Sequence, residues 1–239
     1  MIMTDTVQFR VKRSDPATGR SEFQEYQFPY RRGMTILDGL WYIIDHLDGS
    51  LGFRYSCRGS VCGSCAMQVN GDIRLACETQ ISTLPPGVIT LEPLGHMTII
   101  RDLIVDMEPF FAKFQAIKPY LELLHDHERE NLQSAQERQQ IKDAVNCILC
   151  ASCYAACPIT WHHEDYLGPA ALSASQRFVF DSRNDNSGER LRQMNAREGV
   201  DGCKKISRCT EVCPKHVAPS DRIQELKDLI KEKSAKGTL

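Results

Sequence analysis

The residues of this chain that can do chemistry are mainly its eleven cysteines, which fall into three runs. The first run has the C-x4-C-x2-C spacing of plant-type [2Fe-2S] ferredoxins and consists of Cys57, Cys62, Cys65 and Cys77. The second has the C-x2-C-x2-C-x3-C-P spacing of bacterial ferredoxins and consists of Cys147, Cys150, Cys153 and Cys157. Thiolates at these spacings bind iron–sulfur clusters, so the sequence predicts one-electron transfer.

The third run repeats the second with one ligand missing. It consists of Cys203, Cys209 and Cys213, and Ile206 stands where the second run has Cys150. An aliphatic side chain offers iron no lone pair. The cluster at this position therefore has three protein thiolates, which suits a [3Fe-4S] centre.

The ligands can be assigned by the rule that, in two-cluster ferredoxins, the fourth cysteine of each run binds the cluster of the other run. The predicted [4Fe-4S] ligands are Cys147, Cys150, Cys153 and Cys213. The predicted [3Fe-4S] ligands are Cys157, Cys203 and Cys209. Together with the four cysteines of the first run, these sets use all eleven thiols.

Structural disulfides and zinc are the alternatives for these cysteines. An odd number of cysteines and a beginning unlike a secretory signal argue against disulfides. Zinc does not explain two different ferredoxin spacings in one chain. Iron–sulfur clusters are therefore the favoured interpretation.

Two domains are predicted, residues 1–105 and 106–239. The first begins with strand-like alternation and a turn at residues 15–19. Thr35 is expected to cap a helix that extends to Leu47. Asn70-Gly71 predicts a hairpin that pairs Val69 with Asp72 and returns Cys77 to the loop of the other three ligands.

The loop that carries the first three cysteines contains two glycines. Gly59 and Gly63 are expected to take positive φ and to direct backbone N–H groups at the cluster sulfurs. Arg54 and Arg58 flank the loop. They either tune the cluster electrostatically or are ordinary surface arginines.

The second domain is expected to be helical. An aromatic stripe from Met107 to Ile117 and a helix starting at Ser220 have helical spacing. Residues 125–142 are predicted to form a polar linker or surface helix, and Asp181–Arg190 a polar loop. Lys231–Leu239 is predicted to be a frayed tail.

Charge and composition exclude several classes of protein. The net charge of −2 implies no nucleic-acid partner, and no apolar run approaches the roughly 20 residues of a membrane span. The beginning resembles no secretory or transit signal, which favours a prokaryotic protein at the cytoplasmic side of the inner membrane. Any membrane attachment must come from a partner.

No catalytic residues are predicted. The chain has no Gly-x-Gly-x-x-Gly fingerprint for a flavin or nicotinamide, and no nucleophile–base constellation can be argued. Three clusters form an electron conduit, so the substrate chemistry is expected in another subunit.

Short motifs extend over almost the whole chain. They include Ser56-Cys57-Arg58, Cys62-Gly63-Ser64-Cys65, Ile100-Arg101-Asp102-Leu103, Gly168-Pro169-Ala170, Asp181-Ser182-Arg183 and Glu211-Val212-Cys213-Pro214-Lys215. With the three cysteine runs, they resemble the iron–sulfur subunit of succinate dehydrogenase and quinol:fumarate reductase. The resemblance implies an α+β fold, in which an N-terminal β-grasp plant-type [2Fe-2S] ferredoxin domain is followed by an all-α bacterial-type ferredoxin domain with two clusters.

The resemblance also implies the partners. One is a flavoprotein subunit with covalent FAD that interconverts succinate and fumarate, and the other is a membrane anchor that holds quinone. Lys204 departs from the His that dehydrogenases usually carry there. The length of the Ile159–His163 loop looks closer to fumarate reductases, whereas Ala66-Met67 and Tyr166–Ala170 look more like the dehydrogenases. Both directions of the reaction remain open.

The resemblance and its departures single out five residues for a quinone role: Pro158, Trp161, Lys204, Ile206 and Lys227. The Trp161 indole either donates a hydrogen bond to quinone or anchors the chain against the membrane subunits. The two lysines either neutralise charge on reduced quinone or are ordinary surface lysines.

Two other functions have the same cluster content. A freestanding multi-cluster ferredoxin is usually smaller and strongly acidic, and this chain is neither. A fumarate reductase that uses thiols generally carries a further cysteine-rich domain. Stable co-purification with a flavoprotein separates the subunit from the free carrier.

Overall fold

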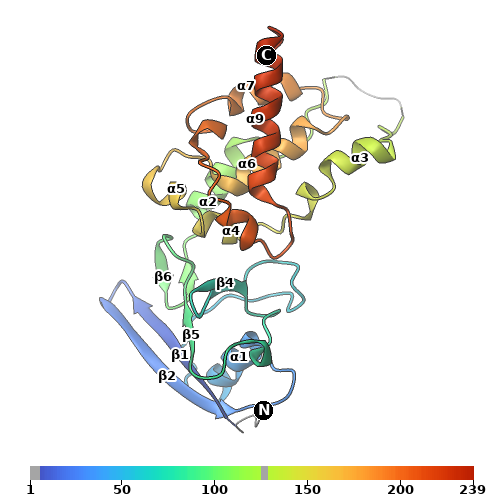
Figure 1. The fold of residues 1–239 in the computed structure, drawn as a ribbon. Coiled ribbons are helices and arrows are strands. Elements are labelled where there is room, and N and C mark those ends of the chain that lie inside the picture. The colour runs from blue at the N-terminus through green and yellow to red at the C-terminus, as the bar shows by residue number, and fades with distance from the viewer. Residues whose placement is uncertain (1–5, 125–128) are drawn as a thin grey trace. The chain divides into compact units, whose positions relative to one another are not determined.

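A computed structural model describes residues 6–124 and 129–239, and it divides into two compact units (Figure 1). The first unit comprises the described residues up to Met107 together with Ile148–Ser152. The second comprises the described residues of Glu108–Cys147 and Cys153–Leu239. The boundary between residues 105 and 106 stays a prediction, and residues 125–128 of the predicted polar linker lie outside the described residues.

The first unit contains a five-stranded mixed sheet with the order β2-β1-β5-β3-β4. Its strands are β1 (Thr6–Asp15), β2 (Arg20–Pro29), β3 (Ala66–Val69), β4 (Asp72–Leu75) and β5 (Ile89–Glu92). β5 runs parallel to β1, whereas the β1–β2, β3–β4 and β3–β5 pairs are antiparallel. A two-stranded ribbon consists of β6 (Ile99–Arg101) and β7 (Ile104–Val105).

Helix α1 (Ile36–His46) packs against this sheet and confirms the predicted helix. Thr35 is its N-cap, and Asp38 completes a capping box with it. Leu40 from the helix and Phe9 from β1 are completely buried. Burying these apolar side chains between helix and sheet forms the core of the unit.

The β3–β4 hairpin has the predicted register. Val69 pairs with Asp72, and Asn70 and Gly71 between them both have positive φ, as a two-residue hairpin turn requires. The Ala76 N–H donates to the Cys65 carbonyl at 3.1 Å, one pair beyond the strands. The hairpin therefore returns the chain to the cysteine loop just before Cys77.

A buried charge network lies at the end of β1 and was not predicted. Arg13 is 1% exposed; its Nε donates to Asp102 at 2.9 Å and its NH1 to Asp48 at 2.6 Å. Tyr26 Oη also donates to Asp48, at 2.7 Å. Asp102 further accepts the Gly52 N–H at 2.8 Å. The network thus ties strand, loop and ribbon together.

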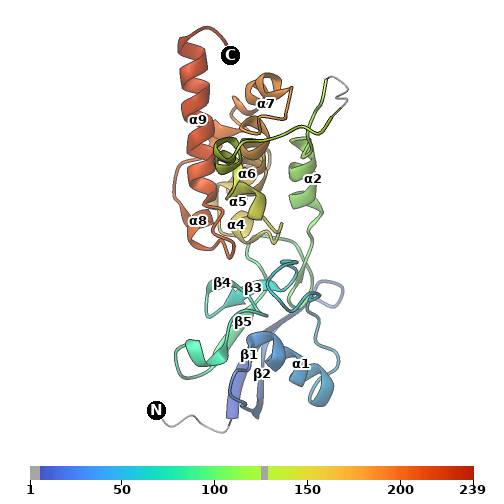
Figure 2. The same ribbon diagram turned by 90° about the vertical axis from the view of Figure 1, so that its right-hand side faces the viewer.

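Helices predominate in the second unit. Together with α4, which begins in the segment assigned to the first unit, the helices are α2 (Glu108–Ala116), α3 (Ala135–Ile141), α4 (Ser152–Ala155), α5 (Pro158–His162), α6 (Gly168–Val179), α7 (Ser187–Met194), α8 (Arg208–Glu211) and α9 (Pro219–Ala235). Short 3-10 turns are η1 (Ile81–Thr83) in the first unit, and η2 (Ala144–Asn146) and η3 (Val200–Gly202) in the second. The long helix α9 lies against α6, as both views show (Figures 1 and 2).

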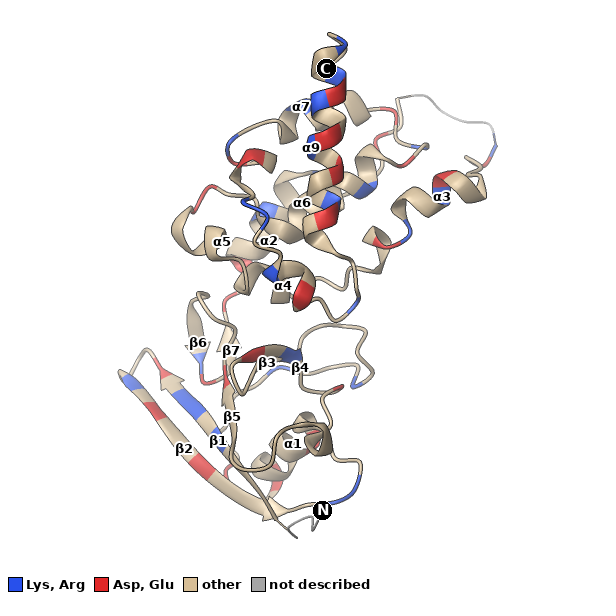
Figure 3. Cartoon of the chain, viewed as in Figure 1, with Lys and Arg blue, Asp and Glu red and all other residues tan. Residues whose placement is uncertain are grey.

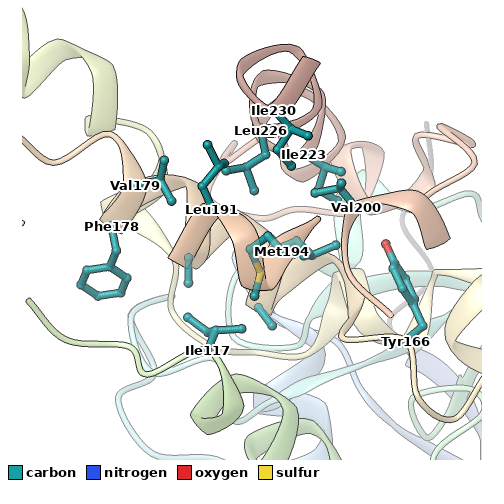
Figure 4. Close-up of a cluster of buried hydrophobic side chains, with 13 residues drawn as sticks. Ile117, Tyr166, Phe178, Val179, Leu191, Met194, Val200, Ile223, Leu226 and Ile230 are labelled. Atoms are coloured by element: carbon teal, nitrogen blue, oxygen red, sulfur yellow. The ribbon is translucent and has the colours of Figure 1, made fainter. Parts of the chain in front are cut away.

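The core of the second unit is an apolar cluster between α6, α7 and α9 (Figure 4). Leu172, Leu191, Met194 and Leu226 are its completely buried members on these helices. Ile117, just after α2, is also completely buried, which agrees with the predicted aromatic stripe as a core element.

Two predictions for this unit were wrong. Residues 181–190 are not simply a polar loop, because α7 begins at Ser187 and Arg190 is only 3% exposed. Arg190 donates to the backbone carbonyls of Ile117 and Lys118, which explains how a charged residue is buried here. The predicted tail from Lys231 continues α9 as far as Ala235.

Charges of both signs are interspersed along α9 (Figure 3). This agrees with the nearly balanced composition. In the part of the chain that the structure describes, no helix is both long and apolar enough to cross a bilayer.

Candidate iron–sulfur sites

The loop before β3 directs backbone N–H groups at the first cysteine of the chain. Cys57 Sγ accepts three such bonds, at 3.4, 3.3 and 3.2 Å, from Gly59, Val61 and Cys62. These bonds lower the pKa of Cys57 to about 6, with the Gly59 N–H making the largest contribution. The loop therefore favours the thiolate, which is the form that binds iron.

The four cysteines of this run are connected by pairwise contacts. The Cys57 N–H donates to Cys62 Sγ at 3.5 Å, and Cys65 interacts electrostatically with both Cys62 and Cys77. Burial raises the pKa of Cys65 to about 12. Iron removes the proton from a coordinating thiol, so a bound cluster offsets this cost. The four thiols and their N–H donors fit a [2Fe-2S] cluster.

Positive φ values in this loop fall only partly where they were expected. Gly63 has a φ of +73°, but Gly59 is not left-handed, and Arg58 and Ser60 on either side of it are. Alternating conformations of this kind turn successive N–H groups toward one point. The expectation for Gly59 was therefore wrong, although the predicted N–H donors are present.

Gly63 also makes a close backbone approach within the first unit. A Cβ on Gly63 would lie 2.6 Å from Cys150 Cβ and 2.9 Å from Cys150 Cα, in the Ile148–Ser152 segment. Such distances are shorter than van der Waals contact, and backbone cannot move aside easily. Only glycine fits here.

Gly63→Ala is expected to prevent normal assembly of the cysteine loop. A methyl group at this position overpacks the backbone and adds left-handed strain, a combined cost of roughly 2–5 kcal/mol. EPR quantification of the reduced [2Fe-2S] signal should show loss of most of the cluster. Gly59→Ala is the matched control, because its Cβ meets only Cys57 O at 3.6 Å. Equal cluster content in the two variants would contradict this role of Gly63.

The second and third runs share a backbone pattern that supports their alignment. Leu149 and Ala151, which flank Cys150, have φ of 55° and 61°. Lys205 and Ser207, which flank Ile206, have φ of 55° and 66°. Non-glycine residues rarely adopt this conformation. Ile206 therefore occupies the structural position that Cys150 has in the second run.

The cysteines assigned to the four-iron cluster come from both units of the structure, and two of them have hydrogen-bond partners of their own. The Val217 N–H donates to Cys213 Sγ at 3.4 Å, and Cys150 Sγ lies 3.3 Å from Ser152 Oγ. Cys150 belongs to the first unit, whereas Cys147, Cys153 and Cys213 belong to the second. This ligand set stays a prediction.

Three cysteines from the second and third runs converge in one recess of the second unit. The lining of the recess includes Cys157, Cys203 and Cys209. Ile206 also lines it and is 50% exposed. The structure thus brings together three thiols and an aliphatic residue at the fourth position.

The chemistry of these thiols fits a metal cluster. Burial raises the pKa of Cys157, and it raises that of Cys209 to about 12. Each also interacts electrostatically with Cys203. Cys209 is buried and Cys157 and Cys203 are half-buried, so three thiolates at one place are costly unless a cation is bound, and iron supplies that charge.

Among the described residues, no three His, Cys, Asp or Glu side chains are close enough together to hold one metal ion. In a three-iron or four-iron cluster each thiolate binds a different iron atom, so its ligands lie farther apart than those of a single ion.

The residues predicted to contact quinone separate into two groups. Pro158, Lys204 and Ile206 line the three-cysteine recess. Trp161 is 39% exposed and its Nε1 donates to the Ala155 carbonyl at 2.9 Å, whereas Lys227 Nζ donates to the Cys203 carbonyl at 2.8 Å. The quinone roles stay predictions, and both polar groups have partners within the chain.

The two arginines near the first run have structural contacts. Arg54 NH1 donates to the Val105 carbonyl at 2.8 Å. The Arg58 guanidinium lies 4.7 Å from the centroid of the Trp41 ring, a cation–π distance. These contacts show how both side chains are held, and their electrostatic role at the cluster stays a prediction.

Comparisons with known families define the class of protein. Residues 8–112 match the 2Fe-2S iron-sulfur cluster binding domain, and residues 143–217 match the 4Fe-4S dicluster domain. The chain is therefore an iron–sulfur protein with a [2Fe-2S]-binding domain followed by a dicluster domain, which confirms the predicted α+β fold class.

Whole-chain relatives define the family. The chain is 40% identical over 230 residues to the fumarate reductase iron-sulfur subunit of Mycobacterium tuberculosis (strain CDC 1551 / Oshkosh), covering 94% of this chain and 93% of that one. It belongs to the family of succinate dehydrogenase and fumarate reductase iron–sulfur subunits, as its motifs predict. It is thus an electron-transfer subunit of an oxidoreductase.

Solved structures share the fold. A chain of the Mycobacterium smegmatis Sdh1 complex in the apo form has a TM-score of 0.88 at 24% identity, covering 97% of this chain and 98% of that one. A hypothetical protein from Helicobacter pylori has a TM-score of 0.58 at 15% identity, covering 96% of this chain and 40% of that one.

Proposed function

We propose that this chain relays electrons between the FAD of a flavoprotein subunit, which interconverts succinate and fumarate, and quinone at a membrane anchor. The observation that carries the proposal is the recess in which Cys157, Cys203 and Cys209 converge beside Ile206. It supports a three-iron cluster as the terminal centre. The relative that is 40% identical supports the flavoprotein partner.

The proposed cofactors follow the three ligand sets. Cys57, Cys62, Cys65 and Cys77 hold [2Fe-2S]. Cys147, Cys150, Cys153 and Cys213 hold [4Fe-4S]. Cys157, Cys203 and Cys209 hold [3Fe-4S]. Together these clusters supply one-electron steps between two partners that each exchange two electrons.

The quinone is proposed to bind near the three-cysteine recess. Three of the predicted quinone contacts line this recess together with the thiols and therefore support this position: Pro158, Lys204 and Ile206. Trp161 is proposed to act through its exposed ring as an apolar anchor, since its N–H is already donated within the chain. Lys227 is proposed to hold the backbone of Cys203 and to place a positive charge nearby.

The chain is proposed to lie at the cytoplasmic side of a prokaryotic inner membrane, attached through the anchor subunits. The same electron route serves succinate oxidation in the tricarboxylic acid cycle and fumarate reduction in anaerobic respiration. The length of the Ile159–His163 loop supports the second direction, and the Tyr166–Ala170 motif supports the first.

Purification of the tagged chain from its native membranes tests this proposal. We expect a FAD-containing flavoprotein to co-purify and the complex to reduce a dye with succinate. The chain freed of its partner should retain its clusters but show no succinate oxidation. Purification of a loaded chain without a flavoprotein would favour a freestanding carrier. Succinate oxidation by the chain alone would contradict the division of labour.

A further inference from the structure

Tyr166 is a buried residue of the three-cysteine recess and is neither a predicted cluster ligand nor a predicted quinone contact. Its side chain is 2% exposed, and it lines the same recess as Cys157, Cys203 and Cys209. It is part of the buried cluster in Figure 4, where it is drawn with its hydroxyl oxygen. A phenol in this place brings a protonated oxygen to the site of the three thiols.

The backbone of Tyr166 is held on both sides. Its N–H donates to the His163 carbonyl at 3.1 Å, and its carbonyl accepts a hydrogen bond from Lys113 Nζ at 2.9 Å. These bonds connect it to the loop after α5 and to α2. The direction in which the side chain leaves the backbone is thereby restricted.

The ring is held by the residue that precedes Cys203. A Cβ on Gly202 would lie 2.5 Å from Tyr166 Cδ2 and 2.9 Å from its Cε2, so glycine at 202 allows the ring to lie against the chain. The same glycine belongs to the η3 turn that leads into Cys203. The ring and the cluster ligand are therefore positioned by one segment.

The Tyr166 hydroxyl interacts with sulfur. The Tyr166 side chain lies near the Cys203 thiol, where a hydrogen bond between the two is within reach, and within electrostatic range of Cys157 and Cys209. A phenol is protonated at neutral pH, whereas an iron-bound thiolate has no proton to give. Once the cluster is bound, Tyr166 can only be the donor of this bond.

We propose that Tyr166 is a positioning residue that donates an O–H···S hydrogen bond to Cys203 and raises the reduction potential of the three-iron cluster. Reduction adds negative charge to the cluster, and a donor at a ligand sulfur stabilises the more negative state. Lys227 binds the carbonyl of Cys203, so the two residues act on different atoms of this ligand. The inference rests on the proposed [3Fe-4S] assignment.

Stepwise reduction of the complete complex, followed by EPR, tests the inference with Tyr166→Phe. We expect the three-iron potential to fall by a shift equivalent to about tenfold in the redox equilibrium, which is about 59 mV for a one-electron couple. The potentials of the [2Fe-2S] and [4Fe-4S] clusters should stay unchanged. Tyr120→Phe is the matched control, because it removes a hydroxyl from a residue that is 57% exposed in the same unit.

The outcomes separate this inference from the proposed function. An intact three-iron signal with an unchanged potential in Tyr166→Phe overturns the inference. A wild-type complex without any three-iron signal overturns the cluster assignment itself. If Tyr166→Phe fails to retain the cluster, the potential is measured instead with 3-fluorotyrosine at position 166. This residue keeps the ring and the hydroxyl but is a stronger hydrogen-bond donor. A higher potential supports the inference, and an unchanged one overturns it.

Discussion

Ile206→Cys is expected to convert the three-iron cluster into a four-iron cluster. Ile206 lies at the structural position of Cys150, between two left-handed residues, and it lines the recess of the three thiols. A thiolate there supplies the missing ligand. The near-isotropic EPR signal of the oxidised protein should disappear, and the reduction potential should fall by on the order of 100 mV or more, because cluster type is a main determinant of potential.

Ile206→Val is the matched control for this conversion. It removes one methylene group but offers iron no ligand, so the oxidised signal should remain. In Ile206→Cys, succinate-dependent dye reduction at the flavin should persist while quinone reduction slows. An unchanged three-iron signal in the cysteine variant would contradict the alignment of the two runs.

Arg13→Met is expected to destabilise the first unit strongly. The change leaves Asp102, which is 2% exposed, and Asp48 without the cation that both contact. Removing one partner of a buried ion pair costs about 3–5 kcal/mol. For a chain of this size that is roughly 10 °C in the unfolding temperature. Loss of visible cluster absorbance on heating measures the shift.

Two further variants identify the cause of this destabilisation. Arg10→Met removes an exposed arginine from the same strand and should cost at most the cation–π contact with Phe23, about 0.5–1 kcal/mol. Adding Asp102→Asn to Arg13→Met should recover part of the loss, because it removes the buried charge that has lost its closest cation and keeps only Arg101, at 3.7 Å. An unfolding temperature for Arg13→Met equal to that of Arg10→Met would contradict the role of the network.

Local signals explain what the sequence could predict. The spacing of cysteines within each run is a short-range property, and so are the Thr35 cap and the Asn70-Gly71 turn. The missing ligand at Ile206 was visible because two runs could be compared within one chain. The structure confirms the cap and the hairpin, and it brings Cys157 together with the third run.

Long-range partners explain what the sequence could not predict. Arg13 lies 35 residues from Asp48 and 89 from Asp102, so nothing near it in the sequence indicates burial. Arg190 likewise contacts carbonyls 72 and 73 residues away, and polar composition alone suggested a loop. Tyr166 was visible only as part of a motif, because its relation to Cys203 depends on folding.

Left-handed residues in the cluster loops are an intermediate case. Arg58, Ser60, Leu149 and Lys205 are not residue types that favour positive φ, so composition did not reveal them. Leu149 and Lys205 each stand two residues after the first cysteine of their run, whereas Arg58 stands one residue after Cys57. The left-handed positions of one cluster loop become predictable only when those of the matching loop are known.

The most direct test of the central claim is low-temperature EPR of the purified complex, first oxidised and then reduced in steps. The account predicts a near-isotropic signal in the oxidised sample that disappears on mild reduction, followed by the signals of the [2Fe-2S] and [4Fe-4S] clusters. An oxidised sample without that signal, from which only two cluster types appear on reduction, would contradict the assignment of Cys157, Cys203 and Cys209 to a three-iron cluster.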